Sequence, residues 1–234
     1  MKVSDYFFTD YYHKYITIEA DFLTEKLKKE IKVHEDDCYA LCSSYLDEEG
    51  YLNFNVLSIG PSWAECTRGL KKKSMLGSFG IDEVYNLEAR IAEADMDMKK
   101  KNDPFLKKMD MIFDEDLLKT RLDARLDYVR DIYFPDVVMT GLINDRSMTE
   151  YAMRITGIKG PFLAGILQQE PEEDIGVHID DHLYVLPYVK DGEIRLFALF
   201  TGENMDAEDE DAMERIIQET AEMGLDFNGI TLRS

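Results

Sequence analysis

The sequence predicts an α+β protein with a mostly antiparallel sheet that is built from hairpins and flanked by helices. In the second half of the chain, two pairs of apolar runs with strand-like composition each surround a glycine turn. A similar pair surrounds Gly50 in the first half. Helical periodicity occurs in blocks between these hairpins rather than in strict alternation with single strands, which favours α+β over a parallel α/β fold.

The first half of the chain contains one predicted hairpin and two predicted helices. A polar helix is expected over 18–32, and the β-rich runs on either side of Gly50 predict the hairpin. Residues 60–80 combine glycines with a basic triplet and show no period, so we expect a long loop there. A second helix is expected over 82–98, where the sequence KKKNDP ends it.

A longer helix is expected over 104–133. Asp103 is a suitable N-cap and Pro104 suits the first helical position. The helix would carry an apolar stripe spaced by three or four residues, formed by Leu118, Leu122, Leu126, Val129 and Tyr133. The break at KKKND divides the chain into an N-terminal α+β region, 1–100, and a region 101–234, either as two domains or as one continuous domain.

Region 101–234 continues with a β-meander of two hairpins and an acidic helix over 207–223. Residues 162–167 are apolar on both faces, so that strand should be central. Pro187 cannot donate to a ladder and is expected in an edge strand or at a bulge. In the final helix, acidic residues crowd the first turn, where the helix dipole favours them.

The cysteines and the N-terminus predict a protein of a reducing, cytoplasmic compartment. The three cysteines are an odd number, and Cys38 and Cys42 fall in a predicted strand about 13 Å apart, too far for a disulfide. We therefore expect free thiols. The first residues contain no apolar signal segment, and no stretch approaches 18 apolar residues, so no membrane partner is expected.

The formal net charge of −21 argues against nucleic acid and anionic lipid as partners, because both would be repelled. Residues 170–234 hold 18 acidic and four basic residues, a net −14. This asymmetry suggests an acidic protein-binding module that neutralises or regulates a basic partner, in the manner of immunity or antidote proteins.

The expected partner-binding residues are Glu208, Asp209, Glu210, Asp211 and Trp63. The acidic residues would steer a cationic partner, or they would only form a solvated surface that matches the helix dipole. Trp63 would be an exposed hot spot, or it would fold over the core.

The segment GVHIDDHLYVLPY, 176–188, holds two histidines spaced by four residues. His178 and His182, with Asp180, Asp181 or Glu170 as oxygen ligands, would form a metal or acid/base site, and the alternative function is therefore a metal-assisted hydrolase. The other interpretation is a polar turn that enters a strand. No nucleophile elbow, P-loop or HExxH motif is present, and no cofactor is expected.

The stretch 150–186 holds a set of spaced residues: Tyr151, Met153, Gly165, Leu167, Glu170, Pro171 and Asp181. At these positions the stretch resembles a small, β-rich, functionally uncharacterised bacterial domain family. The sequence departs from the family at Ala152, at Gln169 where the family has asparagine, and at Asp180 where it has glycine. The resemblance implies a turn over 176–183 and implies no activity.

Overall fold

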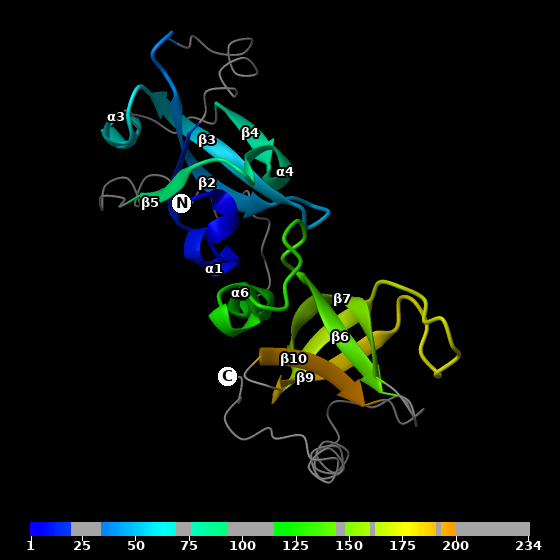
Figure 1. Ribbon diagram of the computed structural model, residues 1–234. Coiled ribbons are helices and arrows are strands. Elements are labelled where there is room, and N and C mark those ends of the chain that lie inside the picture. Colours follow the sequence, from blue (N-terminus) through cyan, green and yellow to red (C-terminus); the bar gives the residue numbers. More distant parts are fainter. Residues whose placement is uncertain are drawn as a thin grey trace. The chain divides into compact units, whose positions relative to one another are not determined.

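The computed structural model describes residues 1–19, 34–68, 76–92, 115–143, 148–159, 162–190 and 193–199. The fold is α+β, and antiparallel pairs dominate its sheets (Figure 1). The chain divides into two compact units: Met1–Phe113 with Ile132–Pro135, and Asp114–Asp131 with Asp136–Ser234. The expected boundary at residue 100 lies outside the described residues. None of the helices in the described ranges is long and apolar enough to cross a membrane.

The first unit contains a five-stranded sheet with the order β4-β3-β2-β1-β5. Its strands are β1 (Tyr15–Glu19), β2 (Tyr39–Leu46), β3 (Leu52–Gly60), β4 (Gly77–Gly80) and β5 (Ala89–Ala92). Short helical segments accompany the sheet: the 3-10 helix η1 (Val3–Asp5), α1 (Phe8–Tyr11), α3 (Trp63–Arg68) and α4 (Ile81–Val84). The edge strands β4 and β5 have four residues each, which leaves little unpaired backbone exposed.

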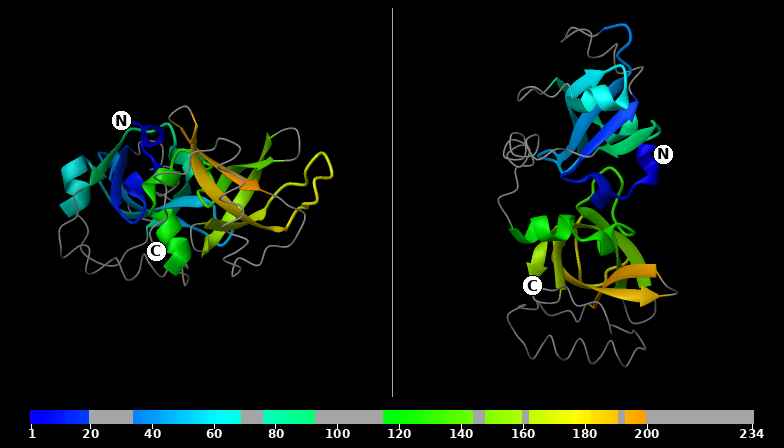
Figure 2. Two further views of the ribbon diagram at one scale, coloured as in Figure 1. Left: turned by 90° about the horizontal axis from the view of Figure 1, so that it is seen from below. Right: turned by 90° about the vertical axis from the view of Figure 1, so that its left-hand side faces the viewer.

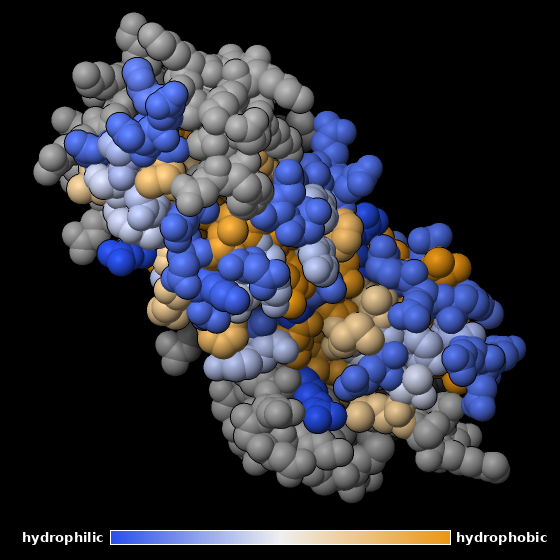
Figure 3. Space-filling view, turned by 45° about the horizontal axis from the view of Figure 1, so that its top comes forward, coloured by the Kyte–Doolittle hydropathy of each residue, from blue (hydrophilic) through white to orange (hydrophobic). Residues whose placement is uncertain are grey.

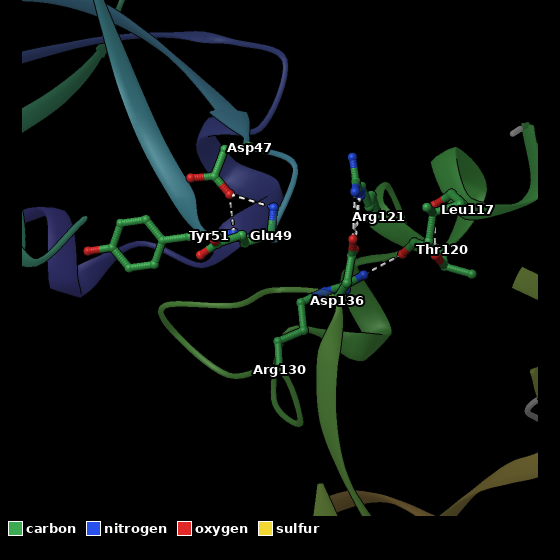
Figure 4. A network of polar contacts seen from close by, with 8 residues as sticks. All are labelled: Asp47, Glu49, Tyr51, Leu117, Thr120, Arg121, Arg130 and Asp136. Carbon is green, nitrogen blue, oxygen red and sulfur yellow. Dashed lines mark hydrogen bonds and ion pairs between the residues drawn. The ribbon is translucent and has the colours of Figure 1, made fainter. Parts of the chain in front are cut away.

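The predicted hairpin around Gly50 is confirmed as β2–β3, with Leu46 opposite Leu52. The Asp47 carboxylate accepts hydrogen bonds from the backbone N–H groups of Glu49 and Tyr51, at 3.1 and 2.9 Å (Figure 4). Gly50 has φ +81°, in the left-handed region that glycine adopts without steric cost. The turn chemistry that the sequence displays therefore sets the register of the two longest strands of this sheet.

Aromatic side chains near the N-terminus pack against this sheet. The rings of Phe8 and Tyr12 stack with centroids 4.5 Å apart, and the ring of Tyr11 lies 5.5 Å from that of Phe54 on β3. The Ser44 hydroxyl donates to the carbonyl of Tyr11 at 3.0 Å, so α1 is fixed to β2 by a buried hydrogen bond as well as by packing.

Three expectations for the first unit are wrong, at least in part. The helix expected over 82–98 is replaced by the single turn α4 and by strand β5, while 93–98 lie outside the described residues. The helix expected over 18–32 does not begin at Ile18, which belongs to β1, and 20–32 are not described. The expected loop 60–80 contains α3 and β4. In β1, β4 and β5, pairing with a strand that is distant in sequence overrides the local sequence pattern.

The second unit is a closed barrel with the strand order β10-β6-β7-β8-β9 (Figure 2). Its strands are β6 (Val137–Ile143), β7 (Met148–Lys159), β8 (Phe162–Leu167), β9 (His182–Lys190) and β10 (Glu193–Leu199). Consecutive strands pair in an antiparallel manner, and an odd number of strands makes the first and last parallel. The barrel accordingly closes through the parallel pair β10–β6, with Leu196 opposite Thr140.

Both hairpins predicted for this region are confirmed as β7–β8 and β9–β10, whereas β6 was not predicted. Strand β8 is central, as expected, because it pairs with β7 and β9. Pro187 lies in β9, and because the barrel is closed, β9 is not the edge strand that was one of the two expected positions for this proline. Within the described residues, Pro187 pairs with Leu196 of β10, and the β8–β9 ladder runs from His182 to Val185.

The barrel interior is filled by apolar side chains from all five strands. The most buried are Val138, Leu142, Met153, Ile155, Leu163, Leu167, Leu183, Val185, Leu196 and Ala198, each at most 2% exposed. Gly165 is required by space, because a Cβ there would lie 2.7 Å from the carbonyl oxygen of Arg154 and 2.8 Å from the sulfur of Met153. The interior is therefore a packed core.

The long helix expected over 104–133 is wrong beyond Arg121. Helix α6 spans Glu115–Arg121, a 3-10 turn η2 follows over Ala124–Leu126, and 104–114 are not described. The Asp123 carboxylate caps η2 by accepting the N–H of Arg125 at 3.0 Å, which interrupts the helical ladder. The predicted apolar stripe is consequently split: Leu126 is 1% exposed, whereas Leu122 is 52% exposed.

One buried ion pair joins α6 to the residue that precedes β6, and a second lies within the turn between them. The Arg121 guanidinium donates from Nε to Oδ1 of Asp136 at 2.9 Å and from Nη2 to Oδ2 at 2.5 Å, with both side chains at most 9% exposed. Arg130 lies 3.6 Å from the Asp127 carboxylate. It also donates to the carbonyl of Thr120 (Figure 4). Burial lowers the pKa of Arg130, and the carboxylates of Asp136 and Asp127 oppose that shift.

We expect Asp136→Ala to lower the free energy of unfolding by about 3–5 kcal/mol, because it leaves the Arg121 cation buried without its carboxylate. Lys119→Ala, which removes the exposed Lys119–Asp116 pair on the same helix, should cost less than about 1 kcal/mol. Urea unfolding of the wild type and both variants measures the difference. Arg121→Met combined with Asp136→Leu should recover most of the loss. Equal effects of the two single variants would contradict this role for the buried pair.

Candidate binding surface on the β8–β9 loop

The segment that joins β8 to β9, residues 168–181, is here called the acidic loop. It contains six carboxylates and neither lysine nor arginine. Its ends are tied to the barrel, since Leu167 N–H donates to the Asp181 carbonyl at 3.0 Å and Gln168 N–H donates to the Ala152 carbonyl at 2.8 Å. Val177 is 1% exposed and joins the barrel core, and Ile175 packs against it. The loop is thus anchored at both ends and near its middle.

This anchoring directs the charged side chains outward. The exposed acidic residues of the loop are Glu170, Glu172, Glu173, Asp174 and Asp180, and Asp181 is half-buried. An acidic loop held in shape loses less conformational entropy on binding than a free acidic segment of the same composition. The arrangement therefore presents a concentrated negative field from a defined backbone.

Residues 178–181 form the turn at the tip of the acidic loop. Asp181 N–H donates to the His178 carbonyl at 3.1 Å, and Asp180 N–H donates to the Leu167 carbonyl at 3.0 Å. Asp180 has φ +70°, a left-handed conformation that aspartate tolerates better than most residues. The turn displays Ile179, which is 48% exposed, among carboxylates.

Glu170 connects the start of the acidic loop to this turn. Its Oε1 lies 2.8 Å from Nδ1 of His178, and its Oε2 accepts the N–H of Ile179 at 2.8 Å. The Asp181 carboxylate accepts the N–H of His178, also at 2.8 Å. One carboxylate therefore contacts two consecutive residues of the turn, one through each of its oxygens.

The Glu170–His178 contact changes the pKa of both groups. The hydrogen bond to Glu170 raises the pKa of His178 above its usual value, with smaller contributions from the charges of Asp174 and Asp181. The hydrogen bonds from His178 and from the Ile179 N–H lower the pKa of Glu170. Both side chains are more than half exposed, at 60% and 54%, so solvent screens the pair and its contribution to global stability is small.

The five candidate metal ligands all lie in the acidic loop or directly after it. The structure brings Glu170 and His178 into contact, while His182 is exposed as the first residue of β9, opposite Ile166. In the part of the chain that the structure describes, no group of three His, Cys, Asp or Glu residues is arranged to hold a metal ion. The expected turn is confirmed at 178–181, and the metal site stays a prediction.

The other predicted binding residues do not belong to this loop. Trp63 is the first residue of α3, and its partly buried ring lies 4.5 Å from that of Tyr39, with the Arg90 guanidinium 4.8 Å from its centroid. These contacts agree with the interpretation that Trp63 covers the sheet. Glu208, Asp209, Glu210 and Asp211 lie outside the described residues, as does the helix expected over 207–223.

The cysteines are free thiols, as expected. Burial raises the pKa of Cys66 to about 12 and also raises that of Cys42, so neither thiol forms a thiolate near neutral pH. Cys66 instead donates to the carbonyl of Tyr39 at 3.1 Å, which fixes α3 to β2. These two cysteines have a structural environment rather than that of a nucleophile.

Ile179 was missed as a candidate residue, although its position between a histidine and two aspartates was a usable signal. Figure 3 shows a surface that is largely hydrophilic over many of the described residues, interrupted by separate apolar areas. Among the described residues of the barrel unit, the exposed large apolar side chains are Leu122, Tyr128, Met139, Met148 and Ile179. Of these, only Ile179 lies within the acidic loop, where an apolar centre has a charged rim.

We expect His178→Ala combined with His182→Ala to leave the protein folded and to remove no stoichiometric transition metal, because 178–181 is held by backbone bonds that the variant retains. Elemental analysis and thermal melting of untagged wild type and variant, in one buffer, measure this. A structural metal would behave differently, since its binding free energy contributes to folding. Zinc, iron or manganese that is lost in the variant with a large drop in Tm would establish the metal site.

We compared the chain with models of known protein families, with curated protein sequences and with solved structures. None of the three comparisons returned a match.

Proposed function

We propose that this chain is a protein-binding module that captures a basic protein partner through its acidic surface and thereby neutralises or regulates it. The observation that carries the proposal is the acidic loop: six carboxylates without a basic residue, on a backbone anchored by Val177. The net charge of −21 extends the same negative field over the whole molecule.

Long-range attraction would act first. A molecule of this charge repels nucleic acid and anionic lipid and attracts a cationic protein, which raises the association rate at low ionic strength. The acidic loop would then form the contact, with arginine or lysine side chains of the partner pairing with Glu172, Glu173 and Asp174. Ile179 would supply apolar contact area at the centre of this rim.

The sequence around Glu208, Asp209, Glu210 and Asp211 supports the same proposal through its charge. Together with the acidic loop it belongs to the last 65 residues, which carry a net −14. We assign these four residues a role in steering the partner and assign the acidic loop the direct contact.

We expect the partner to be basic and its association rate to fall by at least about tenfold between 0.05 and 0.5 M salt, since the screening length shrinks from about 10 Å at 0.1 M to about 3 Å at 1 M. Affinity capture identifies the partner, and stopped-flow mixing of the purified pair measures the rate. An association rate that does not change with salt would exclude electrostatic capture.

The residue assignment needs variants with matched charge. Glu172→Gln, Glu173→Gln and Asp174→Asn remove three exposed carboxylates of the acidic loop, while Glu35→Gln, Asp36→Asn and Glu48→Gln remove three exposed carboxylates of the first unit. The triple variant of the acidic loop should slow association severalfold more than the triple variant of the first unit does. It should also speed dissociation. Replacement of Glu208, Asp209, Glu210 and Asp211 by serine should slow association alone. Equal effects of the two triple variants would mean that only net charge matters.

A further inference from the structure

We propose that residues 200–234 dock on the outer face of the barrel, over a row of three apolar side chains. These side chains are Phe162 of β8, Leu186 of β9 and Phe197 of β10, here called the outer row. The occupant of this surface is therefore a segment of the same chain. The inference concerns an intramolecular contact and does not depend on the proposed function.

The outer row faces away from the barrel core. Successive side chains of a strand point to opposite faces, and a neighbour in sequence of each member of the row belongs to the core. Phe197 lies directly opposite Leu186 in the β9–β10 ladder. Leu163 lies opposite Val185, so the same register places Phe162 beside Leu186. The three side chains thus form a continuous apolar row across three neighbouring strands.

The outer row is buried in spite of this position. Phe162 and Phe197 are 2% exposed, and Leu186 is 7% exposed. Elsewhere on the outer face, Met139 of β6 is 46% exposed and Arg154 of β7 is also exposed, as is usual for the outward residues of a barrel. Part of the chain therefore covers the outer row, and this cover is local.

Continuity of the chain favours the segment that follows β10 as the cover. Among the described elements, β8, β9 and β10 make their extensive contacts with strands of the barrel, and α6 packs against β7. Strand β10 ends at Leu199, two residues beyond Phe197, and residues 200–234 follow. Residues 200–206 can extend about 23 Å, which is enough for the chain to reverse its direction and return over Phe197.

The sequence of this segment contains an apolar face that suits the outer row. Met213, Ile216, Ile217 and Thr220 have the spacing i, i+3, i+4 and i+7 of one side of a helix, within the helix expected over 207–223. Because a short tether joins the segment to β10, its effective concentration at the outer row is on the order of millimolar. In dilute solution the segment therefore outcompetes a second copy of the chain for this surface.

The test is NMR spectroscopy of the whole chain with labelled methyl groups and phenylalanine rings. We expect nuclear Overhauser contacts between the methyl groups of Ile216 or Ile217 and the ring of Phe197. The methyl groups of Leu186 should be protected from a soluble paramagnetic probe. A mixture of differently labelled chains shows whether the contacts arise within one chain. Contacts that occur only between chains, or the absence of any contact from residues 200–234 to the outer row, would overturn the proposal.

Two variants of adjacent residues separate docking from a general effect of charge. Ile217→Asp should increase the relaxation of the Leu186 methyl groups by the probe severalfold, while those of Leu163 in the barrel core stay protected. Gln218→Asp adds the same charge on the polar side of the expected helix and should leave Leu186 protected. Equal protection of Leu186 in the two variants would contradict the proposal. If Ile217→Asp also exposes Leu163, the contacts of the wild-type chain decide the result.

Discussion

Closure of the five-stranded barrel depends on one parallel pair, β10 with β6, and the acidic loop depends on that closure. A strand of an open sheet presents unpaired N–H and C=O groups, whereas a closed barrel leaves no edge. Because β10 returns to β6, with Leu196 opposite Thr140, the apolar side chains of all five strands meet in a single core. Val177 reaches that core from the loop, so the shape of the loop is tied to the packing of the barrel.

The buried ion pairs next to β6 add specificity rather than large net stability. Removing charges from water is costly, and the attraction between Arg121 and Asp136 offsets that cost only because the geometry is bidentate. The alternation of arginine and aspartate from Arg121 to Asp136 permits several pairings in an unfolded chain. The folded chain selects one set, and this set directs the chain from α6 into β6.

The buried ion pairs of the barrel unit contrast with the exposed contact in the acidic loop. Arg121 and Asp136 are at most 9% exposed, and arginine keeps its proton at any physiological pH. Glu170 and His178 are more than half exposed, so solvent screens their contact. The protein thus combines a buried charge network that fixes its fold with an exposed contact at the surface of the acidic loop.

The amino-acid sequence by itself determined the α+β class, the three hairpins and the turn at 178–181, because alternation, glycine turns and aspartate caps act within a few residues. It did not reveal β1, β5 or β6, or the closure of the barrel, because each of these depends on backbone pairing between distant segments. It placed Glu170 and His178 among candidate ligands, but their direct contact across the loop came from tertiary structure. The early end of the helix at Arg121 has a local and a tertiary cause. A local apolar stripe favoured continuation, whereas the Asp123 cap and the buried pairing of Arg121 with Asp136 end the helix.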